Sequence, residues 1–252
     1  MWRGTDPHVT RAVMEPYFHK VYAAWQLLAG AADECGTEAA RFDAVDVGRE
    51  FLQIAPCALH YACVVHAFKN GSAPLLRAAG DALLGTVLDI DSLLSSHVGF
   101  VLGTRLRDAR ALGRTEAEAD LMEWNQRSQV TLWVPYGPLG QPPHVTPNLS
   151  APHGIAGYAT KQWGGLERTV HADRFRLFLQ RAADDQPSGA LNITRYLDDV
   201  GAHGVAWENE RWDPDALPAA AVGDPAAISR ALQAKYAAMG TAWAKCPVAG
   251  GE

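Results

Sequence analysis

The apolar residues between positions 75 and 110 recur at steps of three and four, and this spacing constrains the fold more than any other feature of the chain. Such steps return to the same face of an α-helix, so the stripe predicts a helix with one buried face. Its residues are Leu76, Ala79, Leu83, Val87, Ile90, Leu94, Val98 and Val101. Because the span is long for one helix, we expect a bend or break at Gly85, Gly99 or Gly103.

Two upstream segments, 17–28 and 51–68, carry the same spacing of apolar residues, so helices should also precede the long stripe. Pro56 lies inside the second segment, where its ring removes a backbone donor and clashes with the carbonyl of Leu52. A kink or a break is therefore predicted at this position.

Helix signals continue downstream of the stripe. Thr115 can cap a helix through its hydroxyl, and Glu118 completes a capping box. This helix should end near Trp133, because a proline follows two residues later. A further helix is predicted from about residue 155 or 158 to residue 183, with Gly164 and Gly165 as a soft point, and segments 193–200 and 226–239 also have helical patterns.

No alternation of strands and helices interrupts these patterns, so the predicted class is all-α, an irregular multi-helix bundle domain. Residues 135–157 form a long connection rich in proline and glycine. It exceeds the roughly 4–6 residues of an ordinary connection, which favours a lid, a binding loop or a disordered insertion.

Composition excludes several classes of protein. With 48% hydrophobic residues and 20% charged residues in 252, the chain can bury a core, and disorder or coiled coil is not expected. The formal net charge of −6 argues against a nucleic-acid surface. No apolar run reaches the roughly 18–20 residues that span a bilayer, so no membrane segment is predicted.

Four possible metal ligands, Cys57, His60, Cys63 and His66, follow one another at steps of three. On a helix each step rotates by about 300°, so the last ligand faces away from the first. We therefore predict no metal site, and without a phosphate-binding or dinucleotide motif no cofactor either. The chain's four cysteines are too few for a disulfide scaffold and leave the redox compartment open.

Three sequons of the N-x-Ser/Thr type lie at Asn70, Asn148 and Asn192, which favours the secretory route. Aromatic residues also gather around the long connection: Trp124, Trp133, Tyr136, Tyr158 and Trp163. Flat rings beside a cleft suit stacking on a sugar or on another domain. Trp124 and Trp163 are more simply core residues, whereas Trp133 and Tyr158 bracket the connection and are the binding candidates.

Three segments, 93–110, 123–133 and 157–166, together carry a family resemblance. They include Ser95-Ser96-His97-Val98-Gly99, Thr131-Leu132-Trp133 and Gly157-Tyr158-Ala159-Thr160-Lys161-Gln162. In order and spacing they resemble the C-terminal helical domain of the α-N-acetylglucosaminidases, glycoside hydrolase family 89. The resemblance covers residues 15–212. It leaves residues 1–14 as a linker or trimmed start and 213–252 as an Ala-rich helical tail.

The resemblance implies an all-α domain packed against a preceding (β/α)₈ barrel that carries both catalytic carboxylates, so no catalytic residue is expected here. The family hydrolyses terminal α-linked N-acetylglucosamine with retention, as in heparan sulfate breakdown. Trp133 and Tyr158 would reach the sugar pocket, and Asn125, Arg127 and Lys161 would organise helix ends. A lysosomal or secreted location is implied for the parent enzyme.

Departures from the family pattern lie at the pocket edge. Val134 stands where the family has glycine, Gly157 stands where it has aspartate, and the connection between them is lengthened. These changes bear on substrate choice and on retained activity. The alternatives are a free-standing helical carbohydrate-binding or protein-interaction module, and a glycosidase that uses a carboxylate pair of its own. The leading interpretation is a domain that is inactive alone and completes a site on a barrel.

Overall fold

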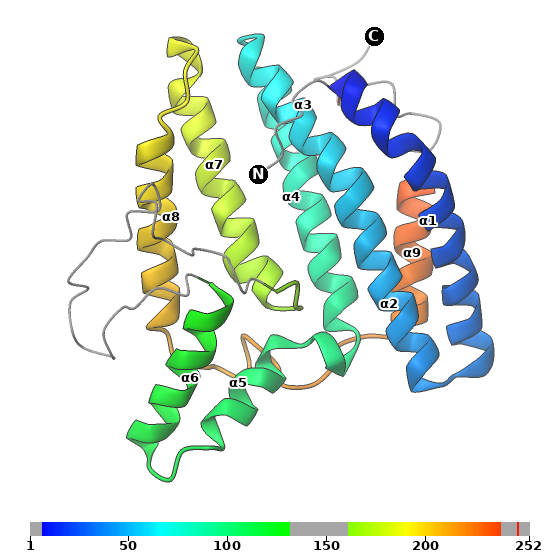
Figure 1. Ribbon diagram of the computed structural model, residues 1–252, viewed down its shortest axis with the longest axis vertical. Coiled ribbons are helices and arrows are strands. Elements are labelled where there is room, and N and C mark those ends of the chain that lie inside the picture. Colours follow the sequence, from blue (N-terminus) through cyan, green and yellow to red (C-terminus); the bar gives the residue numbers. More distant parts are fainter. Residues whose placement is uncertain (1–6, 132–160, 238–245, 247–252) are drawn as a thin grey trace.

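The protein is described here from a computed structural model that covers residues 7–131, 161–237 and 246, with only the backbone described for residues 7–14. Every regular element in these residues is a helix, so the all-α prediction is confirmed (Figure 1). The predicted loop at 135–157 lies outside the described residues.

The longer helices run mostly alongside one another, with α5 and α6 forming a hairpin at one end (Figure 1). Their bounds are α1 Pro7–Cys35, α2 Glu38–Leu52, α3 Ala58–Lys69, α4 Ala73–Ser95, α5 Leu102–Arg110, α6 Glu116–Val130, α7 Ala172–Asp185, α8 Ile193–Glu208 and α9 Pro225–Ala237. Four short elements join them: the π-helices η1 Gln53–Cys57 and η3 Glu167–His171, and the 3₁₀ turns η2 Val98–Phe100 and η4 Gln186–Ser188. Helix α4 packs against α2, α3, α7 and α9.

The long apolar stripe divides as its length predicted. Helix α4 carries it to Ser95, η2 follows at Gly99, and α5 resumes at Leu102. The His97 side chain caps η2 by accepting a hydrogen bond from the Gly99 N–H at 3.1 Å. Gly85 stays within α4 without a break.

Pro56 interrupts the regular hydrogen bonding between α2 and α3, as predicted, and the interruption takes the form of the π-helix η1. The continuous helical stretch Glu38–Lys69 has 32 residues, and one 18-residue window in it has a mean hydropathy of 1.4. By length and composition alone, this stretch could cross a bilayer. Since 56% of that window is buried in the bundle, it has the character of a core helix.

The capping prediction at Thr115 is confirmed, because its hydroxyl oxygen accepts from the Glu118 N–H at 3.2 Å. Helix α6 ends at Val130, a little before the predicted end. The prediction of helix through Gly164 and Gly165 is wrong, since residues 161–165 are not helical. Gly165 has φ +93°, a backbone conformation that residues with side chains rarely adopt.

An aromatic cluster fills the core beneath α1. Trp25 and Phe51 are fully buried, with ring centroids 5.4 Å apart, and Phe18 lies 5.0 Å from Phe51. Gly48 on α2 lets this cluster approach the backbone: a Cβ there would lie 2.5 Å from Trp25 Nε1 and 2.7 Å from Leu93 Cδ2. A glycine is therefore required for α2 to pack against α1 and α4.

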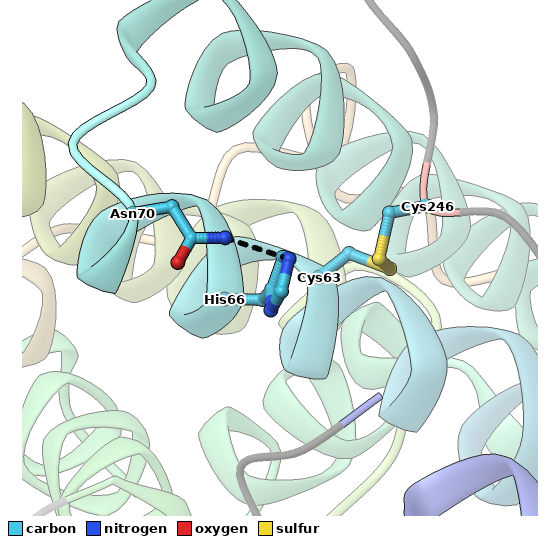
Figure 2. Close-up of a disulfide and its surroundings, with 4 residues drawn as sticks. All are labelled: Cys63, His66, Asn70 and Cys246. Carbon is cyan, nitrogen blue, oxygen red and sulfur yellow. Dashed lines mark hydrogen bonds between the residues drawn. A yellow bond between two sulfur atoms is a disulfide. The ribbon is translucent and has the colours of Figure 1, made fainter. Parts of the chain in front are cut away.

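Of the four spaced Cys and His residues, Cys63 and His66 contact different residues (Figure 2), and Cys57 is a free cysteine. Cys63 forms a disulfide with Cys246, 183 positions away, which ties core helix α3 to the end of the chain. His60 Nδ1 lies 2.9 Å from Thr86 Oγ1, and Nε2 of the half-buried His66 lies 2.8 Å from Asn70 Nδ2. The four cysteines do not form a disulfide scaffold, but two of them form one covalent bridge. The spacing of the cysteines in the sequence did not reveal this bridge.

Two of the three sequon asparagines, Asn70 and Asn192, are exposed. Asn70 is the C-terminal cap of α3, and the Asn192 side chain caps α8 by accepting from the Arg195 N–H at 3.0 Å. The third, Asn148, lies outside the described residues.

Gly48→Ala should lower the free energy of unfolding by about 1–3 kcal/mol, because the added methyl group overlaps the buried Trp25 ring. Gly30→Ala is the matched control on α1, where nothing lies within 4 Å of a new Cβ, and it should raise stability by about 0.5–1 kcal/mol. Urea titration followed by circular dichroism measures both. Equal effects of the two variants would contradict the packing described.

Cys246→Ser should lower the free energy of unfolding by about 2–4 kcal/mol under non-reducing conditions, because the lost bridge closes a long loop. Cys35→Ser, which replaces an exposed free cysteine, is the control and should change little. Thermal unfolding with and without reductant measures the difference. A wild-type midpoint that reductant leaves unchanged would show that the bridge does not contribute.

Candidate functional site

Thr131 and Lys161 flank residues 132–160, the segment that holds both predicted binding residues. Trp133 and Tyr158 themselves lie outside the described residues, as does Tyr136. The described residues show how the two ends of this segment are held. Each end is fixed by a buried polar network, and these two networks are called the α6 anchor and the glycine anchor below.

The α6 anchor is built on Glu123 and Arg127, one turn apart on α6. Arg127 Nε donates to Glu123 Oε1 at 2.8 Å, and both side chains are buried, with exposures of 0% and 1%. The guanidinium also donates to the Trp207 carbonyl at 3.3 Å and lies 4.5 Å from the centroid of that ring. Arg110 Nη1 donates to the second oxygen of Glu123 at 2.9 Å, so the buried carboxylate is fully paired.

Thr131 closes the end of α6 against α8. Its hydroxyl lies 2.8 Å from the Arg127 carbonyl oxygen and 2.6 Å from Glu208 Oε1, and all three residues are buried. Arg127, to which the family resemblance gave a helix-end role, thus links α6 to α8. Asn125 is exposed on α6, and Lys161 is also exposed.

The glycine anchor holds the other end of the segment against η2 and α4. The Gly164 N–H donates to the Phe100 carbonyl at 2.9 Å, and its own carbonyl accepts from the Leu102 N–H at 3.0 Å. A Cβ on Gly164 would lie 2.5 Å from the Ser95 backbone nitrogen. Only glycine therefore allows the chain to lie this close to the end of α4.

Asp91 on α4 completes the glycine anchor. Its carboxylate accepts from the Gly165 N–H at 2.6 Å and the Arg168 N–H at 3.2 Å, and it pairs with the Arg168 side chain at 3.2 Å. Burial raises the pKa of Asp91 above its ordinary value, while these donors act in the opposite direction.

The aromatic residues around the segment are partly placed. Trp163 is half-buried against the cluster that contains Leu102 and Trp207, and Arg105 lies 5.6 Å from its ring centroid. Trp124 is also half-buried. Their predicted core role therefore holds only in part. Trp207 was missed by sequence reasoning, because the helix predicted over 193–200 stops before it whereas α8 continues to Glu208.

Within the described part of the chain, no three His, Cys, Asp or Glu side chains are grouped so that they could hold a metal ion. The polar networks above serve instead to position backbone. The fold and this site together define a helical domain in which Thr131 and Gly164 are each held by a buried polar network.

Solved structures share this fold. A family 89 glycoside hydrolase from Clostridium perfringens in complex with PUGNAc superposes with a TM-score of 0.69 at 20% sequence identity, covering 85% of this chain and 23% of that one. A double variant from the same organism, in complex with its substrate GlcNAc-α-1,4-galactose, gives a TM-score of 0.65 at 21% identity, with 83% and 22% covered. The chain therefore has the fold of a helical domain found in family 89 glycoside hydrolases.

Sequence comparison gives the family. The model of the α-N-acetylglucosaminidase C-terminal domain matches residues 7–235. Human α-N-acetylglucosaminidase is 35% identical over 171 residues, which are 67% of this chain and 21% of that protein. The chain belongs to the α-N-acetylglucosaminidase C-terminal domain family, and it spans about a fifth of the length of the curated relative it matches.

Arg127→Met should lower the free energy of unfolding by about 3 kcal/mol or more, because it removes the partner of a buried carboxylate. Arg107→Met on the neighbouring helix is the matched control, since Arg107 pairs with Asp108 where both side chains are exposed. Urea denaturation measures both variants. If they lost similar stability, the α6 anchor would have no special role.

Proposed function

We propose that this chain is the helical domain of an α-N-acetylglucosaminidase-like glycoside hydrolase and forms one wall of its sugar pocket. In this proposal the substrate is a glycan that ends in α-linked N-acetylglucosamine, of the glycosaminoglycan or heparan sulfate type. The catalytic carboxylates belong to a (β/α)₈ barrel. The observation that carries the proposal is the family match over residues 7–235, which includes both anchors and the segment between them.

Trp133 and Tyr158 are proposed to contact the sugar. Each lies a few residues from an anchor: Trp133 follows Thr131, and Tyr158 precedes Lys161. Aromatic rings bind the apolar face of a pyranose well. Rings attached close to a fixed backbone lose less conformational entropy when they bind. The domain would then position the terminal sugar and exclude water from it, while the barrel supplies acid and nucleophile.

The buried carboxylates of the described residues support a division of roles in which this chain binds substrate and the barrel performs catalysis. Two of their buried carboxylates are engaged: Glu123 pairs with two arginines, and Asp91 binds two backbone N–H groups and Arg168. Such groups hold structure rather than a reacting bond. This supports the proposal that the chain contributes binding and that the reaction occurs on barrel residues.

The test is a chimaera in which this chain replaces the helical domain of the Clostridium perfringens family 89 enzyme. We expect the chimaera to hydrolyse 4-nitrophenyl α-N-acetylglucosaminide and the isolated chain to show no hydrolysis of it. Trp133→Ala should lower kcat/KM of the chimaera about tenfold, the size of one aromatic contact. Tyr17→Ala on α1, where the ring is 58% exposed, is the control and should have no effect.

Activity of the isolated chain would contradict the proposal and direct attention to its own carboxylates. An isolated chain that binds N-acetylglucosamine through Trp133 but never restores hydrolysis would favour the free-standing carbohydrate-binding module.

A further inference from the structure

A cleft of about 430 Å³ lies between α3, α4, α7 and α8, and both π-helices of the structure line it. Cys57 enters from η1, and Glu167 and His171 enter from η3. A π-helix bulges the backbone and is common at functional sites, because it turns side chains out of the regular helical register. Two such segments, far apart in sequence, facing one cavity indicate a built pocket.

Glu167 is a buried polar group of this cleft that lacks a partner. Its side chain is 4% exposed, and Oε1 makes no hydrogen bond with any described residue. Burial, with a smaller contribution from the charge of Asp91, raises the pKa of Glu167 to about 8. At neutral pH the carboxyl is therefore mostly protonated and can donate a hydrogen bond into the cleft.

Arg174 follows Glu167 by seven residues, and both side chains line the cleft. Its guanidinium forms no ion pair within the described part of the chain, and its buried Nε has no hydrogen-bond partner. Burial lowers the pKa of Arg174, and interactions with Tyr196 and Glu208 act in the opposite direction. The Nε donor itself has lost its hydration without gaining a hydrogen bond. A ligand that accepts from this group would remove that cost.

The other titratable side chains of the cleft are neutral. His171 Nε2 lies 3.1 Å from the Lys161 carbonyl, which can only accept, so Nε2 carries the proton and Nδ1 is left as an acceptor. Burial lowers the pKa of His171 to about 4 and raises that of Cys57 to about 12. Burial also raises the pKa values of Tyr61 and Tyr196. Arg174 is thus the single charge among the lining residues at neutral pH.

Aromatic rings form the walls around this charge. The Phe178 ring centroid lies 5.7 Å from that of Tyr61 and 5.8 Å from that of Tyr196. Phe175 and Ile90 extend the apolar lining. A single cation between aromatic rings suits a ligand with one negative charge and a planar body. A phosphate with two negative charges would leave one of them without a cationic partner in this cleft.

We propose that this cleft binds a small organic monocarboxylate with a planar body and a second polar group. Its carboxylate would pair with Arg174, its ring would pack against Phe178, and its far polar group would accept from Glu167. The inference uses neither Trp133 nor Tyr158, so it stands or fails separately from the proposed function.

The test is isothermal titration of the 252-residue chain with 4-hydroxybenzoate at pH 6.5. Binding is expected for this probe and at least tenfold weaker binding for 4-hydroxybenzamide, which has the same shape without the charge. Arg174→Met should lower the affinity for 4-hydroxybenzoate at least tenfold. Arg176→Met is the matched control on α7, where the side chain is 48% exposed and pairs with Asp173, and it should bind like wild type.

A second readout follows the proton on Glu167. Asp91 on α4, Arg49 on α2 and Cys57 on η1 interact electrostatically with Glu167, and His171 on η3 and Arg174 on α7 line the same cleft. Between pH 6.5 and 8.5 the Glu167 carboxyl loses its proton while the phenol of 4-hydroxybenzoate stays mostly protonated, so the cleft loses a donor and gains a negative charge. Affinity for 4-hydroxybenzoate should fall over this range in wild type and stay level in Glu167→Gln.

Three results would overturn the proposal: no binding of 4-hydroxybenzoate by wild type, equal binding of the amide, or an affinity that is independent of pH. The first two are measured on unaltered protein, so they decide the question even if Arg174→Met does not fold.

Discussion

The Asp91 carboxylate connects the apolar core to the segment on which the proposed function depends. It lies on α4 beside Ile90, in the buried stripe, where an unpaired charge would be very costly. Three donors from residues 165 and 168 satisfy it. The same contacts fix the backbone at residues 165 and 168. A single buried group therefore couples the packing of α4 to the position of a loop end, and Gly164 provides the space for this approach.

The α6 anchor performs the same task at the other end by different means. Glu123 and Arg127 form a buried pair, and Trp207 and Thr131 connect it to α8. Buried polar networks of this kind contribute specificity of position more than stability, since each member requires its partners in one geometry. Two such networks at the ends of one segment suit a domain that must present side chains to a partner from fixed points.

Local signals were enough to predict most of the fold. The stripe of α4, the proline at position 56 and the cap at Thr115 each depend on neighbours within one or two turns, and each was confirmed. The failures involve distant contacts. The local pattern predicts helix through Gly164 because it holds no trace of the contact with Ser95, and the bridge from Cys63 to Cys246 spans 183 positions. The cleft at Glu167 likewise needs four helices and both π-helices brought together. The sugar-binding roles of Trp133 and Tyr158 remain predictions.

The central claim is that the segment between the two anchors forms a wall of the sugar pocket. The most direct measurement is a crystal structure of this chain joined to the catalytic barrel of the Clostridium perfringens family 89 enzyme, with PUGNAc bound. The account predicts that the Trp133 and Tyr158 rings lie in van der Waals contact with the inhibitor. An inhibitor held by the barrel alone, with both rings turned away from it, would contradict the account.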